Sequence, residues 1–319
     1  MKSSKPVAVI DKSLLQAICA VPEAKLRENL LNELFKHYQL VIPFVLVEEV
    51  WINFGKPKDN KSAAVHEMVK LLKQLTKLWM DDEIEIIFKE LVQGQSIKRS
   101  PPPPKDLINF AINLESNNPR FLQWLEENWN AKKQAIDERV AEQRSILPAG
   151  SFATISSEDD LFEKFIRVKF MEILESPERT KQLLENSLGR QLRGRHTNFK
   201  PRIEEAFGRF NKETFKKYPV TLSYILTSMF YFYAPLCRIQ QSSGEKKRKL
   251  IGSAKNEQRN NITDQQYVVS ALLCERLLTS DEGMRNIMNI FKRGGFWTGE
   301  TVFIDLHQNL SNQIPKLFI

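Results

Sequence analysis

Short apolar runs of the kind that form buried strands stand near both ends of the chain. The run 7–10 contains two valines and is followed by Asp11, a pattern typical of a central parallel strand. Similar runs at 39–43, 277–279 and 301–305 predict three further strands. The buried strands of a parallel sheet are therefore expected to come from the two ends of the sequence.

Apolar residues with helical spacing separate these runs. They predict helices at 13–18, at 23–37, from residue 45 onward, and from about 284 to a stop at Gly294–Gly295. Another helix is expected to open at Thr263 and Asp264, because threonine is a good N-cap residue and carboxylates are favoured at helix starts. The strand–helix–strand rhythm predicts an α/β fold with a central parallel sheet and right-handed crossovers.

The middle of the chain has a different pattern. Helices are predicted at 62–79, 106–114, 120–146, 157–174, 178–192 and 203–217, and the segment 83–88 fits either a strand or a helix. The proline run 101–104 is expected to act as a stiff spacer. We therefore expect an α/β domain formed by residues 1–58 and 219–319, with a mostly helical insertion at 59–218.

An uncharged segment and a basic segment follow the insertion. Residues 220–237 carry no charge over 18 positions, which is long enough for a membrane span. The segment also contains seven serine, threonine and tyrosine residues and Pro235, so we expect a buried helix packed on the sheet and no membrane contact. The polar, basic segment 240–261 is expected to be a mobile loop.

Composition agrees with a soluble globular protein. Of the 319 residues, 42% are hydrophobic and 27% are charged. The three cysteines have no metal-ligand spacing, and the first residues lack the apolar run of a signal peptide. We expect buried thiols, a reducing compartment and a cytoplasmic location.

Positive charge is concentrated in two places. The net charge is +8, and segment 189–218 has nine Lys/Arg against three acids, while segment 244–260 has six against two. Such a concentration favours an anionic partner, with nucleic acid ahead of a membrane surface. A solvated charged surface without a partner is the alternative.

Acidic residues follow the predicted strands or lie early in the predicted helices. They are Asp11, Glu49, Asp264 and Asp281. Residues just beyond the carboxyl ends of parallel strands line the usual ligand site, so these acids are candidates for one crevice. A carboxylate cluster requires cations, and oxygen ligands suit Mg²⁺ or Mn²⁺. Taken singly, each acid also fits a helix cap or a surface position.

The sequence resembles the PIN-domain nucleases. The stretches VAVIDKS, IPFVLVEEV, NNITDQQYVVSA and LLTSDEGM carry the resemblance, which covers residues 5–58 and 219–319. It implies a three-layer α/β/α fold in which Asp11, Glu49, Asp264 and Asp281 are the catalytic, metal-binding acids. Ser13 and Thr279 match the family's small polar residues at the site. Glu49 is preferred because an apolar residue follows it, and Glu48 is the alternative.

The chain also departs from the family pattern. Many members have an aspartate three residues before the late helix acid, where this chain has Asn261. About 160 central residues have no counterpart in a typical domain of the family. The first departure removes one possible ligand, and the second leaves room for a protein partner on the helical insertion.

The resemblance implies a Mg²⁺- or Mn²⁺-dependent endonuclease that acts on RNA, with a metal-activated water attacking phosphorus. Basic residues in the segment before Asp264 are expected to contact the substrate backbone. They are Lys246, Lys247, Arg248 and Lys249. Two alternatives stay open: a nuclease-fold protein that has lost activity and binds nucleic acid or protein, and a structure-specific DNA nuclease.

Overall fold

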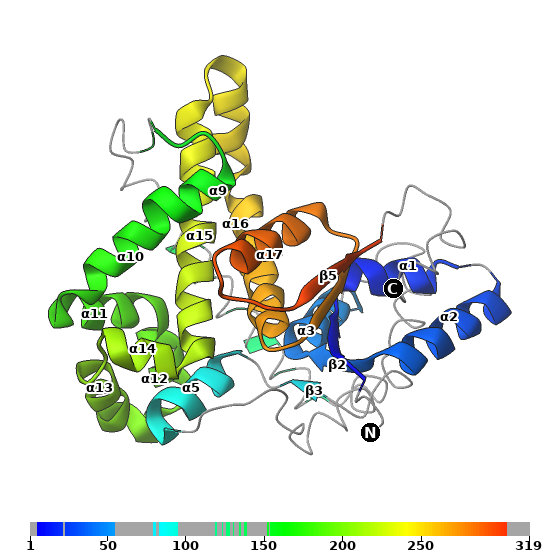
Figure 1. Cartoon of the computed structure of the whole chain (residues 1–319), viewed down its shortest axis with the longest axis horizontal. Helices are drawn as coiled ribbons and strands as arrows, with labels where there is room; N and C mark the ends of the chain where they lie inside the picture. The colour runs from blue at the N-terminus through cyan, green and yellow to red at the C-terminus, as the bar shows by residue number, and fades with distance from the viewer. Residues whose placement is uncertain are drawn as a thin grey trace. The chain divides into compact units, whose positions relative to one another are not determined.

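The computed structural model describes residues 5–21, 23–54, 79–80, 83–94 and 154–304, together with Phe152 and scattered positions between 119 and 138. They belong to two compact units, an α/β unit and a helical unit (Figure 1). The α/β unit comprises Met1–Asp82, Lys98–Glu126 and Ser270–Ile319, and the helical unit comprises Glu83–Ile97 and Glu127–Val269.

A parallel sheet forms the centre of the α/β unit. Its five strands lie in the order β3 (Trp79–Met80), β2 (Gln39–Pro43), β1 (Val7–Ile10), β4 (Arg276–Thr279) and β5 (Glu300–Phe303). All neighbouring pairs are parallel, which confirms the expected α/β class. In the register, Val9 lies between Val41 and Leu277, and all three side chains are fully buried. Their continuous burial explains why the strands read as unbroken apolar runs.

The helices of the α/β unit connect successive strands. They are α1 (Lys12–Cys19), α2 (Ala24–His37), α3 (Phe44–Phe54) and α17 (Glu282–Arg293). The chain moves from β1 outward to β2 and β3, but β4 and β5 lie on the other side of β1. The direction of winding therefore reverses between β1 and β4. The carboxyl ends of two such strands flank the crevice in which open α/β sheets bind ligands.

Helices account for nearly all of the described helical unit. In chain order they are α5 (Glu83–Gln93), α9 (Glu158–Asp160), the π-helical turn η1 (Leu161–Ile166), α10 (Arg167–Leu174), α11 (Pro177–Leu184), the π-helical turn η2 (Glu185–Gly189), α12 (Arg190–Arg195), the 3-10 turn η3 (Thr197–Phe199), α13 (Lys200–Gly208), α14 (Lys212–Lys217), α15 (Pro219–Gln241) and α16 (Gly244–Leu272). The helices expected at 157–174 and 178–192 are confirmed, and 83–88 is helical. The helix expected at 203–217 is interrupted between Gly208 and Lys212. Trp79, expected as the last residue of a helix, lies in β3; the rest of 62–79, together with 101–104, 106–114 and most of 120–146, lies outside the described residues.

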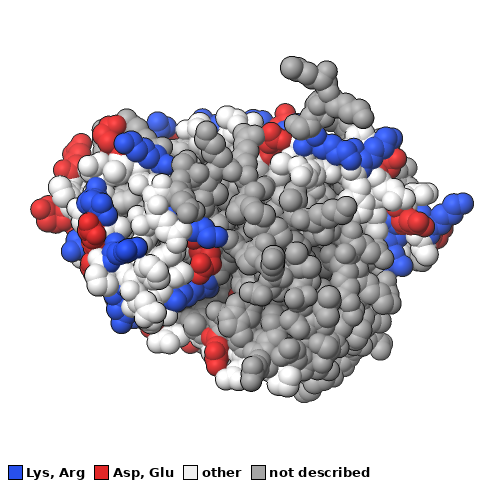
Figure 2. Space-filling model, turned by 90° about the horizontal axis from the view of Figure 1, so that it is seen from below, with Lys and Arg blue, Asp and Glu red and all other residues white. Residues whose placement is uncertain are grey.

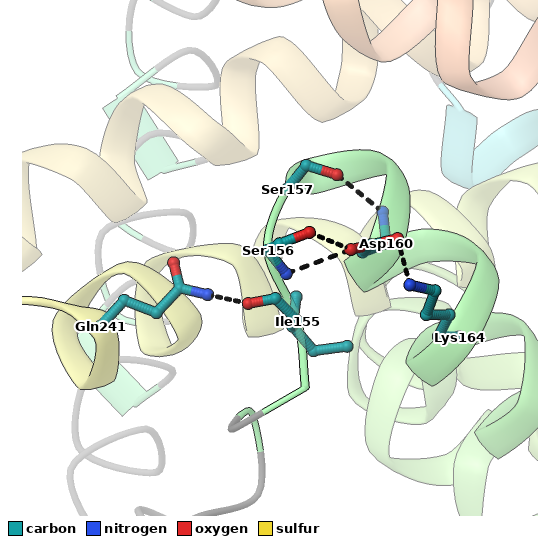
Figure 3. Close-up of polar contacts among 6 residues, drawn as sticks. All are labelled: Ile155, Ser156, Ser157, Asp160, Lys164 and Gln241. Carbon is teal, nitrogen blue, oxygen red and sulfur yellow. Dashed lines mark hydrogen bonds and ion pairs between the residues drawn. The ribbon is translucent and has the colours of Figure 1, made fainter.

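Figure 3 shows the polar contacts around the start of α9. Ser157 caps α9 by accepting a hydrogen bond from the Asp160 backbone N–H at 3.1 Å. The Asp160 carboxylate contacts Lys164 at 2.7 Å and accepts from Ser156, and these partners lower the pKa of Asp160 to about 2. The Gln241 side chain, at the end of α15, donates to the Ile155 carbonyl. Ser156, in the turn before α9, is therefore connected to η1 through Asp160 and Lys164, and Ile155 is connected to α15 through Gln241.

A buried glutamate holds the start of α15. Glu90 on α5 is fully buried, and its two carboxylate oxygens accept hydrogen bonds from the backbone N–H groups of Val220 at 3.1 Å and Thr221 at 2.9 Å. The Thr221 hydroxyl donates to the second oxygen at 2.8 Å. Burial raises the pKa of the Glu90 carboxyl, and these hydrogen bonds oppose the rise. Glu90 supplies partners for N–H groups that the first turn of a helix leaves unsatisfied.

Helices α15 and α16 correct two expectations. Segment 240–261, expected as a loop, is almost entirely helical, because α15 continues to Gln241 and α16 begins at Gly244 with φ of +56°. Glycine accommodates that turn, and the lysines, arginine and leucine after it are good helix formers. For the same reason α16 does not open at Asp264, which lies inside it. The two helices lie side by side (Figure 1), and Gln265 donates to the Tyr224 carbonyl at 3.5 Å.

The apolar helix α15 has partners within the helical unit. It contacts α5, α14 and η1. By length and composition α15 is the one helix among the described residues that could cross a membrane, and 78% of its most apolar window is buried inside the protein. It groups with the helices, whereas we expected it in the α/β domain from residue 219. The boundary between the helical unit and the last segment of the α/β unit lies after Val269.

Candidate functional site

Asp11 stands at the carboxyl end of β1 and begins α1. One of its carboxylate oxygens, Oδ1, accepts a hydrogen bond from the Leu14 backbone N–H at 2.9 Å, which caps the helix. Its other oxygen, Oδ2, accepts from the Ser13 hydroxyl at 2.8 Å and from the Thr279 hydroxyl. The residue is only 2% exposed. The carboxylate is therefore fixed in place by one amide and two hydroxyl groups.

The carboxyl end of β4 supplies the facing side. The Ser280 hydroxyl donates to Ser13 Oγ at 2.6 Å, which continues the hydrogen-bond chain that leads to Asp11. The Asp281 backbone N–H donates to Thr279 Oγ1 at 2.9 Å. Asp281 itself is exposed and caps α17 by accepting from the Met284 N–H at 2.8 Å. Two helix-capping aspartates from neighbouring strands thus share Thr279 as a common partner.

The electrostatics of this pair are unfavourable without a cation. Burial raises the pKa of the Asp11 carboxyl from its ordinary 3.8 to about 6, and the negative charge of Asp281 adds to the rise. The hydrogen bonds from Thr279, Leu14 and Ser13 oppose it without cancelling it. A carboxylate that is held in a costly charged state, in the crevice between β1 and β4, has the character of a functional group.

Two neighbouring glutamates on α3 were candidates for the third acid. Glu49 is partly exposed, and its Oε1 lies 3.2 Å from the Lys12 ammonium, at the first position of α1. Glu48 is 6% exposed. The two residues therefore differ in environment: Glu49 contacts Lys12, the residue that follows Asp11, and Glu48 is buried. Both remain candidates for the site.

The fourth acid, Asp264, lies on α16 in the helical unit and is partly exposed. Asn261, one turn earlier, is 7% exposed, and its amide nitrogen has no hydrogen-bond partner among the described residues. The α/β unit by itself brings together Asp11, Ser13, Thr279 and Asp281. Within the part of the chain that the structure describes, no three His, Cys, Asp or Glu side chains already stand close enough to hold a metal ion.

The two basic segments differ in how their charge is used. In the segment 189–218, Arg193 contacts Glu185 at 2.6 Å and Glu204 at 2.5 Å, and Arg190 and Arg209 also contact acids. On the face seen in Figure 2, described acidic and basic side chains are interspersed. Glu138 and Glu185 lie outside the segment, so their contacts offset part of its excess of nine basic over three acidic residues.

The start of α16 is different. Its first turns carry Lys246, Lys247, Arg248 and Lys249, all exposed, and Lys249 pairs with Glu245 at 2.9 Å. Cations at a helix N-terminus are disfavoured by the macrodipole. These residues therefore reduce the stability of the helix end while presenting positive charge to solvent.

Two residues of the site were missed by sequence reasoning. Ser280 precedes Asp281 and joins the hydroxyl chain, and Lys12 lies between the two candidates Asp11 and Ser13 and contacts a third, Glu49. The signal for Ser280 was its position directly after a strand. No local pattern gives the partner of Lys12, because Glu49 is 37 residues away in the sequence.

Comparison with known proteins adds no assignment: no family model, curated protein or solved structure matches the chain. The site at the ends of β1 and β4 offers carboxylate and hydroxyl oxygens, and oxygen is the ligand type preferred by Mg²⁺ and Mn²⁺. Mg²⁺ typically keeps several waters and binds through one or two carboxylates plus substrate phosphates, so Asp11 and Asp281 meet the minimal requirement in ligand type and number.

Proposed function

We propose that this protein is a Mg²⁺- or Mn²⁺-dependent endonuclease of the PIN-like type, which hydrolyses phosphodiester bonds in RNA. The observation that carries the proposal is the pairing of buried Asp11 with Asp281 at the reversal point of the sheet. A divalent cation would relieve the repulsion between the two carboxylates and stabilise the charged form of Asp11.

In the proposed mechanism, Asp11 and Asp281 would hold the cation, with Glu49 of the same unit as a further ligand. A bound Mg²⁺ or Mn²⁺ ion supplies a Lewis acid and lowers the pKa of water. Ser13 and Thr279 orient Asp11 by donating to its Oδ2, and the Leu14 N–H fixes its other oxygen. Substitution of a residue that hydrogen-bonds a metal ligand typically lowers metal affinity or activity 10- to 100-fold.

The test uses the full chain with end-labelled single-stranded RNA, single-stranded DNA and branched DNA. We expect cleavage of RNA with Mn²⁺ or Mg²⁺ and none in EDTA. Preference for branched DNA would instead support the DNA nuclease, and binding of RNA without cleavage at any metal concentration would support a nuclease-fold binding protein. Cleavage that persists in chelator would reject the metal mechanism.

The basic start of α16 gives a separate expected result. Replacing Lys246, Lys247, Arg248 and Lys249 with glutamine should weaken RNA binding and reduce the slope of log affinity against log salt by about 0.7 for each phosphate that the variant no longer binds. Thermal unfolding should show no loss of stability, because the change removes cations from a helix N-terminus. Binding is measured in EDTA at several salt concentrations. An unchanged slope would show that these residues do not contact phosphate.

The matched control replaces four exposed basic residues of the same unit. Suitable ones are Lys164, Arg167, Lys169 and Arg179, on or beside α10 and α11. The control lowers the net charge by the same amount, so it corrects for the general attraction between a basic protein and RNA. The effect is specific to α16 if the control variant changes the salt slope less.

A further inference from the structure

Lys12 occupies a position that its own helix does not favour. It is the first residue of α1, where the macrodipole opposes a cation, and no acid stands in the first turn of α1. Its ammonium group instead reaches Glu49 on α3, at 3.2 Å. The side chains are 24% and 20% exposed, so solvent screens this pair less than a fully exposed one. The position of Lys12 is therefore explained by Glu49.

The same pair is linked to the proposed metal site through the position of Lys12 in the chain. Lys12 directly follows Asp11, and Glu49 is one of the acids assigned to the cation. Asp11 receives its hydrogen bonds from hydroxyl and amide groups, and the positive charge of Lys12 is directed to Glu49. A carboxylate oxygen that contacts an ammonium group must leave it, or share it, to bind a divalent cation.

We propose that Lys12 and the divalent cation compete for Glu49, and that Lys12, once displaced, binds a phosphate of the substrate. This inference rests on the proposed function and adds to it a substrate-binding residue and an order of events. A bound cation would draw the Glu49 carboxylate away from the Lys12 ammonium. The released ammonium then faces an anionic ligand, so cation and substrate bind with positive coupling, which by linkage is the same in both directions.

Two substitutions of opposite effect test the competition. Lys12→Met keeps the aliphatic stem and removes the charge, so Mn²⁺ should bind roughly two- to five-fold more tightly because the Lys12 ammonium no longer competes for Glu49. Glu49→Gln releases Lys12 without a metal. In EDTA this variant should bind single-stranded RNA roughly two- to five-fold more tightly than the unmodified protein, with a salt slope steeper by about 0.7, the value of one phosphate contact.

The measurements are Mn²⁺ titration by calorimetry without RNA, and RNA binding in EDTA, where no cleavage occurs. Lys36→Met is the matched control, since Lys36 also pairs with a glutamate, Glu33 at 3.5 Å, on the exposed surface of α2. Lys12→Arg keeps the charge and shows whether any effect comes from altered packing. Unfolding curves confirm that each variant is folded.

The outcomes separate this inference from the proposed function. If the unmodified protein binds Mn²⁺ but Lys12→Met binds it equally or more weakly, the competition is rejected and the metal site stands. If Glu49→Gln leaves RNA affinity and salt slope unchanged, Lys12 is not a phosphate ligand. If neither protein binds Mn²⁺, the metal-dependent function and the competition fail together.

Discussion

Replacing Asp11 with asparagine is expected to abolish cleavage and, at the same time, to stabilise the metal-free protein. Activity should fall at least about 100-fold, because the substitution removes a ligand of the proposed metal site, whereas substituting the groups around a ligand typically changes activity 10- to 100-fold. Stability should rise because the pKa of Asp11 is raised from 3.8 to about 6 in the folded protein. Two pKa units correspond to about 3 kcal/mol at most.

The hydrogen-bond partners of Asp11 allow this substitution. The asparagine oxygen can still accept from the Leu14 N–H, and its amide nitrogen faces the hydroxyl groups of Ser13 and Thr279. Hydroxyl groups rotate and accept as readily as they donate, so the amide keeps its partners. The buried charge is removed, and the hydrogen bonds are largely retained.

The dependence on pH has a defined sign. A raised pKa means that the folded protein holds the Asp11 proton more tightly than the unfolded chain does. This contribution to stability is fully present below pH about 4 and is lost as the pH rises through about 6. The free energy of unfolding of the asparagine variant should therefore exceed that of the unmodified protein by an amount that grows between these values and is constant above them.

The measurement is urea unfolding of both proteins in EDTA from about pH 3 to about pH 8, a range that spans both pKa values, with cleavage assayed at neutral pH. An equal difference in stability at the two ends of this range would show that Asp11 is not held in a costly charged state. Full activity of the variant would remove Asp11 from the site. Adding Mn²⁺ should stabilise the unmodified protein and have a smaller effect on the variant, since only a ligand that binds the folded state raises stability.

Sequence patterns predicted the α/β unit well because its signals are local. The runs that became β1, β2 and β4 are buried on both faces, and Asp11 and Asp281 cap helices that begin directly after strands. Ser13 and Thr279 were expected at the site from the family resemblance, and in the structure both donate to Asp11. The rest of the site depends on contacts that no local pattern encodes, such as the ion pair between Lys12 and Glu49.

The errors around α16 have a physical cause. Polar, basic composition favours a loop, but lysine, arginine and glutamate are also strong helix formers, and the turn needed only Gly244 with its positive φ. Asp264 then resembled a helix start because an acid follows Thr263, although the helix had begun at Gly244. The same amino-acid types serve a solvated helix and a solvated loop, so composition alone could not choose between them.

The second large effect is expected at Glu90, the other buried carboxylate with a raised pKa. Glu90→Ala should lower the free energy of unfolding by roughly 3 to 5 kcal/mol, because it leaves a cavity and removes the partners of two buried backbone N–H groups at the start of α15. Chemical unfolding followed by circular dichroism measures the loss. Glu85→Ala on the same helix is the control: its carboxylate contacts His196 Nε2 at 3.1 Å and its side chain is 37% exposed, so the loss should stay below about 1 kcal/mol.

Amide replacement distinguishes Asp11 from Glu90. In Glu90→Gln the new amide nitrogen must face the N–H of Val220 or of Thr221, and neither backbone donor can turn into an acceptor. We expect a loss of roughly 1 to 3 kcal/mol, whereas Asp11→Asn should give a gain. A stabilising Glu90→Gln would show that the N–H groups of α15 find other partners. Burial raises both pKa values, and both carboxylates hold the start of a helix. Their partners differ: Glu90 accepts from two backbone N–H groups, whereas Asp11 accepts from one backbone N–H group and from two hydroxyl groups that can also accept.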